Sequence, residues 1–85
     1  MPRYFFNIRS GSDYVADEEG DECPTLQAAG TRAVVGAQEL LTELNSAQRR
    51  PEETSFEITD EQGRLKLRVP FSLALRLGSA RLGAT

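Results

Sequence analysis

The segment from Thr25 to Ala47 is the only stretch of the chain long and periodic enough to form a full helix. Thr25 can cap its start, because the threonine hydroxyl accepts a hydrogen bond from a backbone N–H of the first turn. Pro51 sets an outer limit at the other end, since proline has no N–H to continue the helix. The apolar residues recur at spacings of three and four, the period of one helix face: Leu26, Ala29, Ala33, Ala37, Leu40, Leu41 and Leu44. Many of these are small, so the helix can lie close against a sheet.

A β-hairpin precedes this helix. Residues 3–9 are rich in aromatic and β-branched side chains and predict a strand, and residues 14–17 predict a short returning strand after a turn at 10–13. With a four-residue loop, Ile8 lies opposite Val15 and Arg9 lies opposite Tyr14. Alternation assigns the even positions to the core (Tyr4, Phe6, Ile8) and the odd positions mostly to solvent (Arg3, Phe5, Asn7, Arg9).

A second hairpin follows the helix. Residues 54–59 and 64–69 alternate polar and apolar side chains around the turn sequence Asp60-Glu61-Gln62-Gly63. A four-residue loop predicts one register for both faces: Ile58 with Leu65, Phe56 with Leu67, Thr54 with Val69, Glu57 with Lys66, and Thr59 with Arg64.

The apolar alternation continues past Pro70 through Phe71, Leu73, Leu75 and Leu77. Proline would remove a ladder hydrogen bond, so residues 71–77 form either a continuing edge strand or a short helix that starts near Ser72. Residues 1–77 are expected to form one domain, and residues 78–85 a flexible tail.

The predicted class is therefore α+β, with the order β-β-α-β-β. Two hairpins form one antiparallel sheet, and the single long helix packs on one face. The expected sheet contribution to the core is Tyr4, Phe6, Ile8, Val15, Phe56, Ile58, Leu65, Leu67 and Val69.

Charge and cysteine content narrow the classes of function. The net charge is −3, with 10 basic against 13 acidic side chains, whereas nucleic-acid binders usually carry a basic excess. No apolar run approaches the roughly 20 residues of a membrane span. The single cysteine, Cys23, permits no intrachain disulfide, which fits a reducing compartment. We therefore expect a cytoplasmic protein that binds neither nucleic acid nor membrane.

An acidic run occupies residues 17–22, where five of six side chains are carboxylates. Such runs usually form solvated loops. A hard cation such as calcium could use these oxygens, but the EF-hand spacing fails, because it places Val15 where the first acidic ligand is needed. We expect no metal site, and the sequence leaves open whether this loop binds a cation.

Catalytic equipment is missing from the sequence. The chain has no histidine, so the commonest general base and any serine–histidine triad are absent. Cys23 lies among acidic residues, which oppose thiolate formation. The glycines match neither a phosphate loop nor a dinucleotide fingerprint. The expectation is a non-enzymatic protein with no catalytic residue and no cofactor.

Two groups of side chains could form an interaction surface. Arg64, Lys66 and Arg68 share one strand, where they either contact an acidic partner or phosphates, or simply pair with Glu57 and solvent. Phe5 and Tyr14 fall on the face away from the helix, where exposed aromatic residues can mark an interface or be covered by the C-terminal segment. Together with the apolar residues 71–77, they favour self-association.

The chain resembles an uncharacterised family of short alphaproteobacterial proteins (domain of unknown function 6894) over about residues 1–75. The family opens with M-P-R-Y-F/Y-F, which Met1 to Phe6 match. The other matching elements are Asp17, Glu19 and Gly20; Leu26 to Ala29; Phe56 to Ile58; Asp60 and Gly63; and Val69 to Phe71. The chain departs from the family at Asn7, where Asp or His is usual, at Thr25 and at Gly30. The resemblance implies no activity, cofactor or catalytic residue. A looser similarity in the order of elements is to HicB-type antitoxins.

Three hypotheses follow. The first is a cytoplasmic interaction domain, as a homodimer or with an unknown protein partner, that uses the exposed sheet face or an edge strand. The second is a HicB-antitoxin-like regulatory module that binds a partner protein, with nucleic acid as an additional ligand. The third is a cation-binding protein or enzyme that works through Asp17, Glu19 and Asp21.

Overall fold

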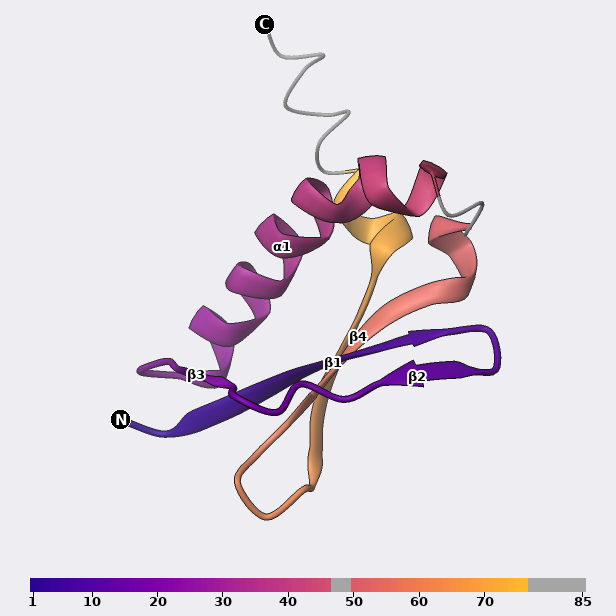
Figure 1. The fold of residues 1–85 in the computed structure, drawn as a ribbon. Helices are drawn as coiled ribbons and strands as arrows, with labels where there is room; N and C mark the ends of the chain where they lie inside the picture. The colour runs from indigo at the N-terminus through magenta and orange to yellow at the C-terminus, as the bar shows by residue number, and fades with distance from the viewer. Residues whose placement is uncertain (47–49, 77–85) are drawn as a thin grey trace, which may run out of the picture.

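The computed structural model describes residues 1–46 and 50–76, and it confirms the α+β class (Figure 1). Five strands form one antiparallel sheet, and a single long helix lies across one of its faces. The elements are β1 (Arg3–Ser10), β2 (Asp13–Val15), β3 (Asp21–Glu22), α1 (Leu26–Ser46), the 3-10 turn η1 (Pro51–Glu53), β4 (Thr54–Thr59) and β5 (Leu65–Pro70), followed by a short helix over residues 71–76. The expected tail, 78–85, lies outside the described residues.

Strand β1 lies next to β4, and the sheet order is β2-β1-β4-β5. The first hairpin has the predicted register, with Ile8 opposite Val15 and Arg9 opposite Tyr14. Strand β3 was not expected. Its two acidic residues pair with Arg3 and Tyr4, on the same edge of β1 that β2 occupies further along. Part of the acidic run is therefore strand rather than solvated loop.

The predicted register of the second hairpin is wrong. Ile58 pairs with Leu67 and Phe56 with Val69, and the register shifts between Ile58 and Thr59. The cause lies in the turn, where the Asp60 carboxylate accepts the N–H groups of Gln62 and Arg64, both at 2.9 Å. The Asp60 amide also donates to the carbonyl oxygen of Arg64 (3.0 Å), so the closed loop includes one residue more than expected.

The longer loop is compensated by a β-bulge, which leaves Lys66 as the extra residue between Leu65 and Leu67. A bulge changes the face to which the neighbouring side chain points. Leu65 consequently pairs with Thr59 on the side away from α1 and is 58% exposed. Its expected place in the core was wrong, as was that of Val15, which is 62% exposed, whereas Leu67 and Val69 keep theirs.

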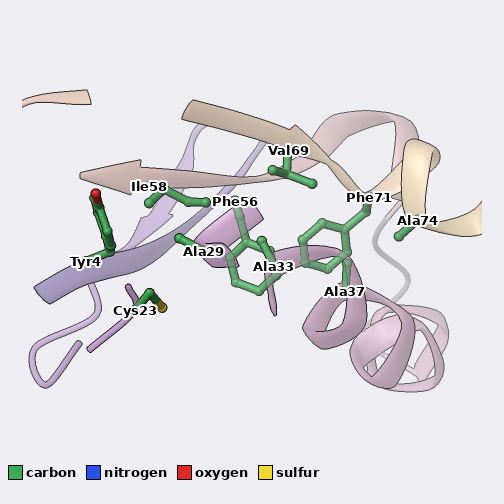
Figure 2. Close-up of a cluster of buried hydrophobic side chains, with 10 residues drawn as sticks. All are labelled: Tyr4, Cys23, Ala29, Ala33, Ala37, Phe56, Ile58, Val69, Phe71 and Ala74. Atoms are coloured by element: carbon green, nitrogen blue, oxygen red, sulfur yellow. The ribbon is translucent and has the colours of Figure 1, made fainter. Parts of the chain in front are cut away.

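Helix α1 packs through the predicted face of small residues. Thr25 caps the helix as expected, because the Ala28 amide donates to its hydroxyl oxygen (3.0 Å). Ala29, Ala33 and Ala37 of this face are buried. Within the core, the ring of Phe56 contacts Phe6 edge-on, with centroids 6.2 Å apart, and Phe71 of the short C-terminal helix at 5.0 Å. Figure 2 shows the buried core: Tyr4, Cys23, Ala29, Ala33, Ala37, Phe56, Ile58, Val69, Phe71 and Ala74.

Residues 71–76 are helical, which decides between the two predicted alternatives. Pro70 ends β5, and the helix that follows buries Phe71 and Ala74 completely. Gln38 of α1 donates to the Ala74 carbonyl oxygen (3.3 Å), which ties the short helix to the long one. Neither described helix combines the length and the apolar character that a bilayer crossing requires.

Candidate interaction surface

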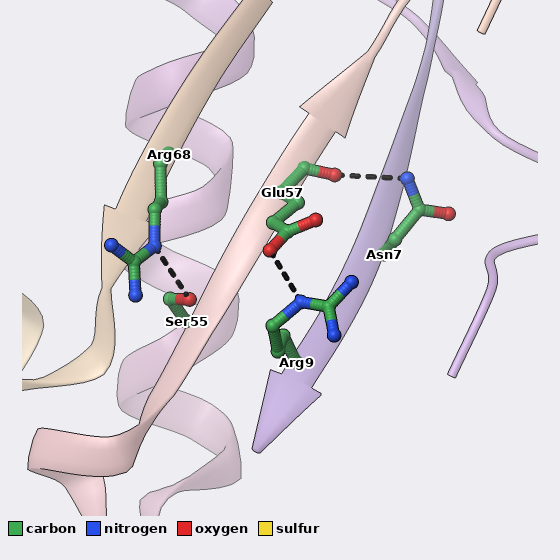
Figure 3. A network of polar contacts seen from close by, with 5 residues as sticks. All are labelled: Asn7, Arg9, Ser55, Glu57 and Arg68. Carbon is green, nitrogen blue, oxygen red and sulfur yellow. Dashed lines mark hydrogen bonds and ion pairs between the residues drawn. The ribbon is translucent and has the colours of Figure 1, made fainter. Parts of the chain in front are cut away.

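The sheet face opposite α1 carries three cross-strand rows of side chains, and we call it the open face. No described helix lies over it, and Figure 3 shows it with α1 behind the strands. The register places the rows side by side: Phe5, Thr59 and Leu65; Asn7, Glu57 and Arg68; and Tyr14, Arg9, Ser55 and Pro70. These residues come from β1, β2, β4 and β5, so only the assembled sheet forms this surface.

Polar contacts link neighbouring rows of the open face (Figure 3). Arg9 Nε donates to Glu57 Oε2 at 2.7 Å, and the Arg9 guanidinium lies 4.6 Å from the centre of the Tyr14 ring. Arg68 Nε donates to Ser55 Oγ at 3.2 Å. The expected ion pair between Glu57 and Lys66 is replaced by the pair with Arg9, because the bulge moves Lys66 out of register.

The three basic residues predicted to share one strand, Arg64, Lys66 and Arg68, have different surroundings in the structure. Arg64 forms an ion pair with Asp60 (Nε–Oδ2 3.2 Å) within the turn. The Arg64 amide, which bonds to the Asp60 carboxylate, is the main cause that lowers the pKa of Asp60 below the ordinary value for aspartate. Arg68 belongs to the open face, and Lys66 is an exposed residue at the bulge. Arg64 is therefore engaged by its own turn, whereas Lys66 and Arg68 are presented along β5.

The two predicted aromatic residues lie on the open face but in different rows. Tyr14 is 45% exposed beneath the Arg9 guanidinium. Phe5 is half-buried, and its ring lies so close to Gly20 that a Cβ there would be 2.9 Å from it. The segment that covers Phe5 is therefore the loop before β3. Of the two, Tyr14 is the more accessible to a partner.

Asn7 is the main error of the alternation argument, because it is only 3% exposed rather than solvated. Its side-chain amide donates to the Glu57 carbonyl oxygen (2.9 Å) and the Thr59 hydroxyl (3.2 Å). Its side-chain oxygen accepts the N–H of Asp17 (2.9 Å). Alternation cannot foresee a loop folding over a solvent-side position, and every hydrogen-bonding group of this amide serves the fold.

Residues of the acidic run also stabilise the fold. The Asp17 carboxylate accepts N–H groups from Phe6 (3.1 Å), Glu19 and Gly20 (both 3.2 Å). Asp21 pairs with Arg32 of α1 at 3.5 Å. Within the described part of the chain, no three His, Cys, Asp or Glu side chains are grouped to hold a metal ion. An aspartate shortly before a glycine is the sequence signal for such a loop.

Two grooves lined by described residues flank α1. One, of about 340 Å³, runs between α1 and β5, and we call it the β5 groove; it is lined by Gln27, Gly30, Thr31, Val34, Leu67, Arg68, Val69 and Leu73. The other, of about 460 Å³, lies on the opposite side of the helix, over Phe6 and Phe56, with Asp17, Asp21, Arg32 and Glu39 around it. The β5 groove adjoins an edge strand, so a partner there would contact backbone and side chains together.

Comparison with known proteins gives one result. The model of a family described as Domain of unknown function (DUF6894) matches residues 3–72. This range contains all five strands and α1. No curated protein and no solved structure matches the chain.

Proposed function

We propose that this chain, which belongs to the DUF6894 family, is a non-enzymatic protein. It binds another protein through the open face and β5. One observation carries the proposal. The open face presents Tyr14 and Leu65, which are 45% and 58% exposed, next to the ordered cations Arg9 and Arg68. Aromatic and arginine side chains that are already held in position contribute strongly to protein interfaces.

The chemistry of the chain supports a binding role over catalysis. The sequence contains no histidine. The Asp17 carboxylate is engaged by three backbone N–H groups and therefore has little freedom to act as a base. Cys23 is a buried free cysteine, which supports a cytoplasmic location. We expect a protein partner and no nucleic acid, cofactor or metal.

Self-association is the second form of the proposal. Burying Tyr14 and Leu65 against a second copy would remove apolar surface from water, at about 25 cal/mol for each Å² buried. A homodimer through the open face is expected to appear in sedimentation at high protein concentration. A strict monomer there would remove the dimer and leave binding to a different protein as the proposed function.

The test is affinity capture from the native host with three matched baits. The first is the wild type, the second carries Tyr14→Ser and Leu65→Ser, and the third carries Val35→Ser on the exposed surface of α1. A partner that binds the open face is retained by the wild type and the Val35 variant and lost by the double variant. Circular dichroism confirms that all three are folded. Equal retention by all three baits would contradict the proposal.

A further inference from the structure

We propose that β5 binds an extended segment of the partner protein, and that this segment alternates acidic and apolar side chains. The segment would add a strand to the sheet beside β5. This inference rests on the proposed function and deepens it, because it names the chemistry of the partner. It draws on three features of the described residues: an unpaired strand edge, the groove next to it, and the charges along it.

The unpaired edge is the first feature. Strand β5 has six residues, five of which pair with β4, and no strand in the described ranges, 1–46 and 50–76, lies on its other side. The opposite border of the sheet consists of the short strands β2 and β3, and between them the Asp17 carboxylate already accepts the N–H of Phe6. An unpaired edge exposes backbone donors and acceptors that another strand can satisfy. Strand β5 is the longer of the two borders and the one without such a block.

The β5 groove is the second feature. The groove is lined by Leu67 and Val69 of β5, by Gly30 and Val34 of α1, and by Leu73 of the short helix. A strand added to β5 would point every second side chain toward α1, into this groove. Its lining is mostly apolar, with Gln27, Thr31 and Arg68 as the polar members, and its volume of about 340 Å³ suits aliphatic side chains. The partner residues on this side are therefore apolar.

The charges are the third feature. Arg68 lies on the open face, and Lys66 is exposed at the bulge. The alternate residues of an added strand would lie next to these cations, where opposite charges attract across strands and like charges repel. The partner residues on this side are therefore acidic.

The same charges argue against β5 of a second copy as the occupant. Symmetric pairing of two β5 strands would bring Lys66 and Arg68 of both copies into one short stretch. Lysine, a bulge and Pro70 are features that keep edge strands from pairing indiscriminately. An acidic strand is attracted by the two cations, whereas a neutral apolar strand is not. Lys66 and Arg68 therefore favour an acidic partner.

The experiment uses synthetic peptides of about eight residues, an ordinary strand length, with blocked ends. One peptide alternates glutamate and valine, and a second alternates lysine and valine. A third has the glutamate–valine composition in two blocks, and a fourth carries N-methyl groups on alternate amides of the glutamate–valine peptide. Binding to the ¹⁵N-labelled protein is followed by amide chemical shifts.

The alternating glutamate–valine peptide is expected to bind and to shift the amides of β5 and of Gly30 and Val34. The lysine–valine and block peptides should bind at least about tenfold more weakly, a difference of about 1.4 kcal/mol. The N-methylated peptide should also lose binding, because it lacks the N–H groups that pair with β5. The double variant Lys66→Glu, Arg68→Glu should reverse the preference toward the lysine–valine peptide.

Equal binding of all the peptides, or shifts confined to residues away from β5, would overturn the inference. A peptide-free dimer whose shifts map to β5 would overturn it as well, because a second copy would then be the occupant. The proposed function is tested separately, by the capture experiment. If the peptides do not bind but capture from the host still depends on Tyr14 and Leu65, the partner uses the open face without adding a strand.

Discussion

The backbone amide of Asp17 donates to the side-chain oxygen of Asn7 at 2.9 Å, and the Asp17 carboxylate accepts the N–H of Phe6 at 3.1 Å. These bonds occupy the part of β1 that has no strand on the edge opposite β4, since on that edge β3 pairs with residues 3–4 and β2 with residues 8–10. The loop residue thus does for β1 what a strand would do, and it leaves β5 as the accessible border of the sheet.

Asp17→Ala is expected to lower the free energy of unfolding by about 1–3 kcal/mol, because partly buried N–H groups lose their acceptor. Urea denaturation measures the change. Glu18→Ala in the same loop serves as the control, since Glu18 is exposed, and it should have little effect. Equal losses in the two variants would show that the Asp17 carboxylate does not hold this loop in place.

Gly20→Ala should destabilise the fold more than Gly63→Ala does. Both glycines have positive φ angles, 72° and 79°, and an L side chain costs roughly 1–2 kcal/mol in that region. A Cβ at Gly20 would also lie 2.9 Å from the Phe5 ring, whereas nothing lies within 4 Å at Gly63. Thermal unfolding of the two variants separates the contact from the φ effect. A smaller loss at Gly20 than at Gly63 would contradict the close contact with Phe5.

Gly36→Ala should stabilise the protein by about 1 kcal/mol, because alanine favours the helix by that amount. The added Cβ would be 3.7 Å from the Phe56 ring, an ordinary contact. Gly30→Ala should gain less, since its Cβ would be 3.0 Å from Leu67 Cδ2 and the leucine must shift. Chemical denaturation of both variants checks the order. A larger gain at Gly30 would mean that Leu67 repacks freely.

Asp60 should make the stability of the protein depend on pH in the acid range. Its pKa is lowered in the folded state, chiefly by the Arg64 N–H, so the folded protein holds the proton less tightly than the unfolded chain does. The resulting stability is present above the unfolded pKa, about 3.9, and is lost as the pH falls through the lower folded value.

Asp60→Asn is expected to remove this contribution of Asp60 to the pH dependence. The stability difference from the wild type should therefore shrink as the pH falls. Denaturation at several pH values tests the effect, and NMR titration of the Asp60 carboxyl gives its direction. Glu18→Gln is the control and should follow the wild type. A constant difference between wild type and Asp60→Asn at all pH values would mean that the charge of Asp60 is not the cause.

Patterns within single elements predicted most of the fold. The small-residue stripe gave the buried face of α1, the threonine before it gave the cap, and the first hairpin gave its own register. Each depends on residues close together in the chain. The second hairpin failed for a local reason of a different kind, because the Asp60 side chain competes for the N–H groups of the turn and lengthens the loop.

The candidate surface was only partly predictable. Tyr14 and Arg68 were identified from alternation, but Leu65 was assigned to the core and Asn7 to solvent. The β-bulge turned Leu65 to the open face, and the loop that contains Asp17 covered Asn7. Simple alternation describes an unbroken strand with one covered face, and neither residue meets that condition.

The sequence by itself determined α1 and the four strands of the two hairpins, and which side of α1 is buried, because helical and strand periods are set by the backbone within a few residues. It did not determine β3 or the short helix over residues 71–76. Only the tertiary structure decided that β1 lies between β2 and β4, that Asp17 blocks one border, and that β5 stays open beside a groove. Those features depend on contacts between residues of different segments. The energy of such contacts cannot be obtained from the sequence pattern of any one segment.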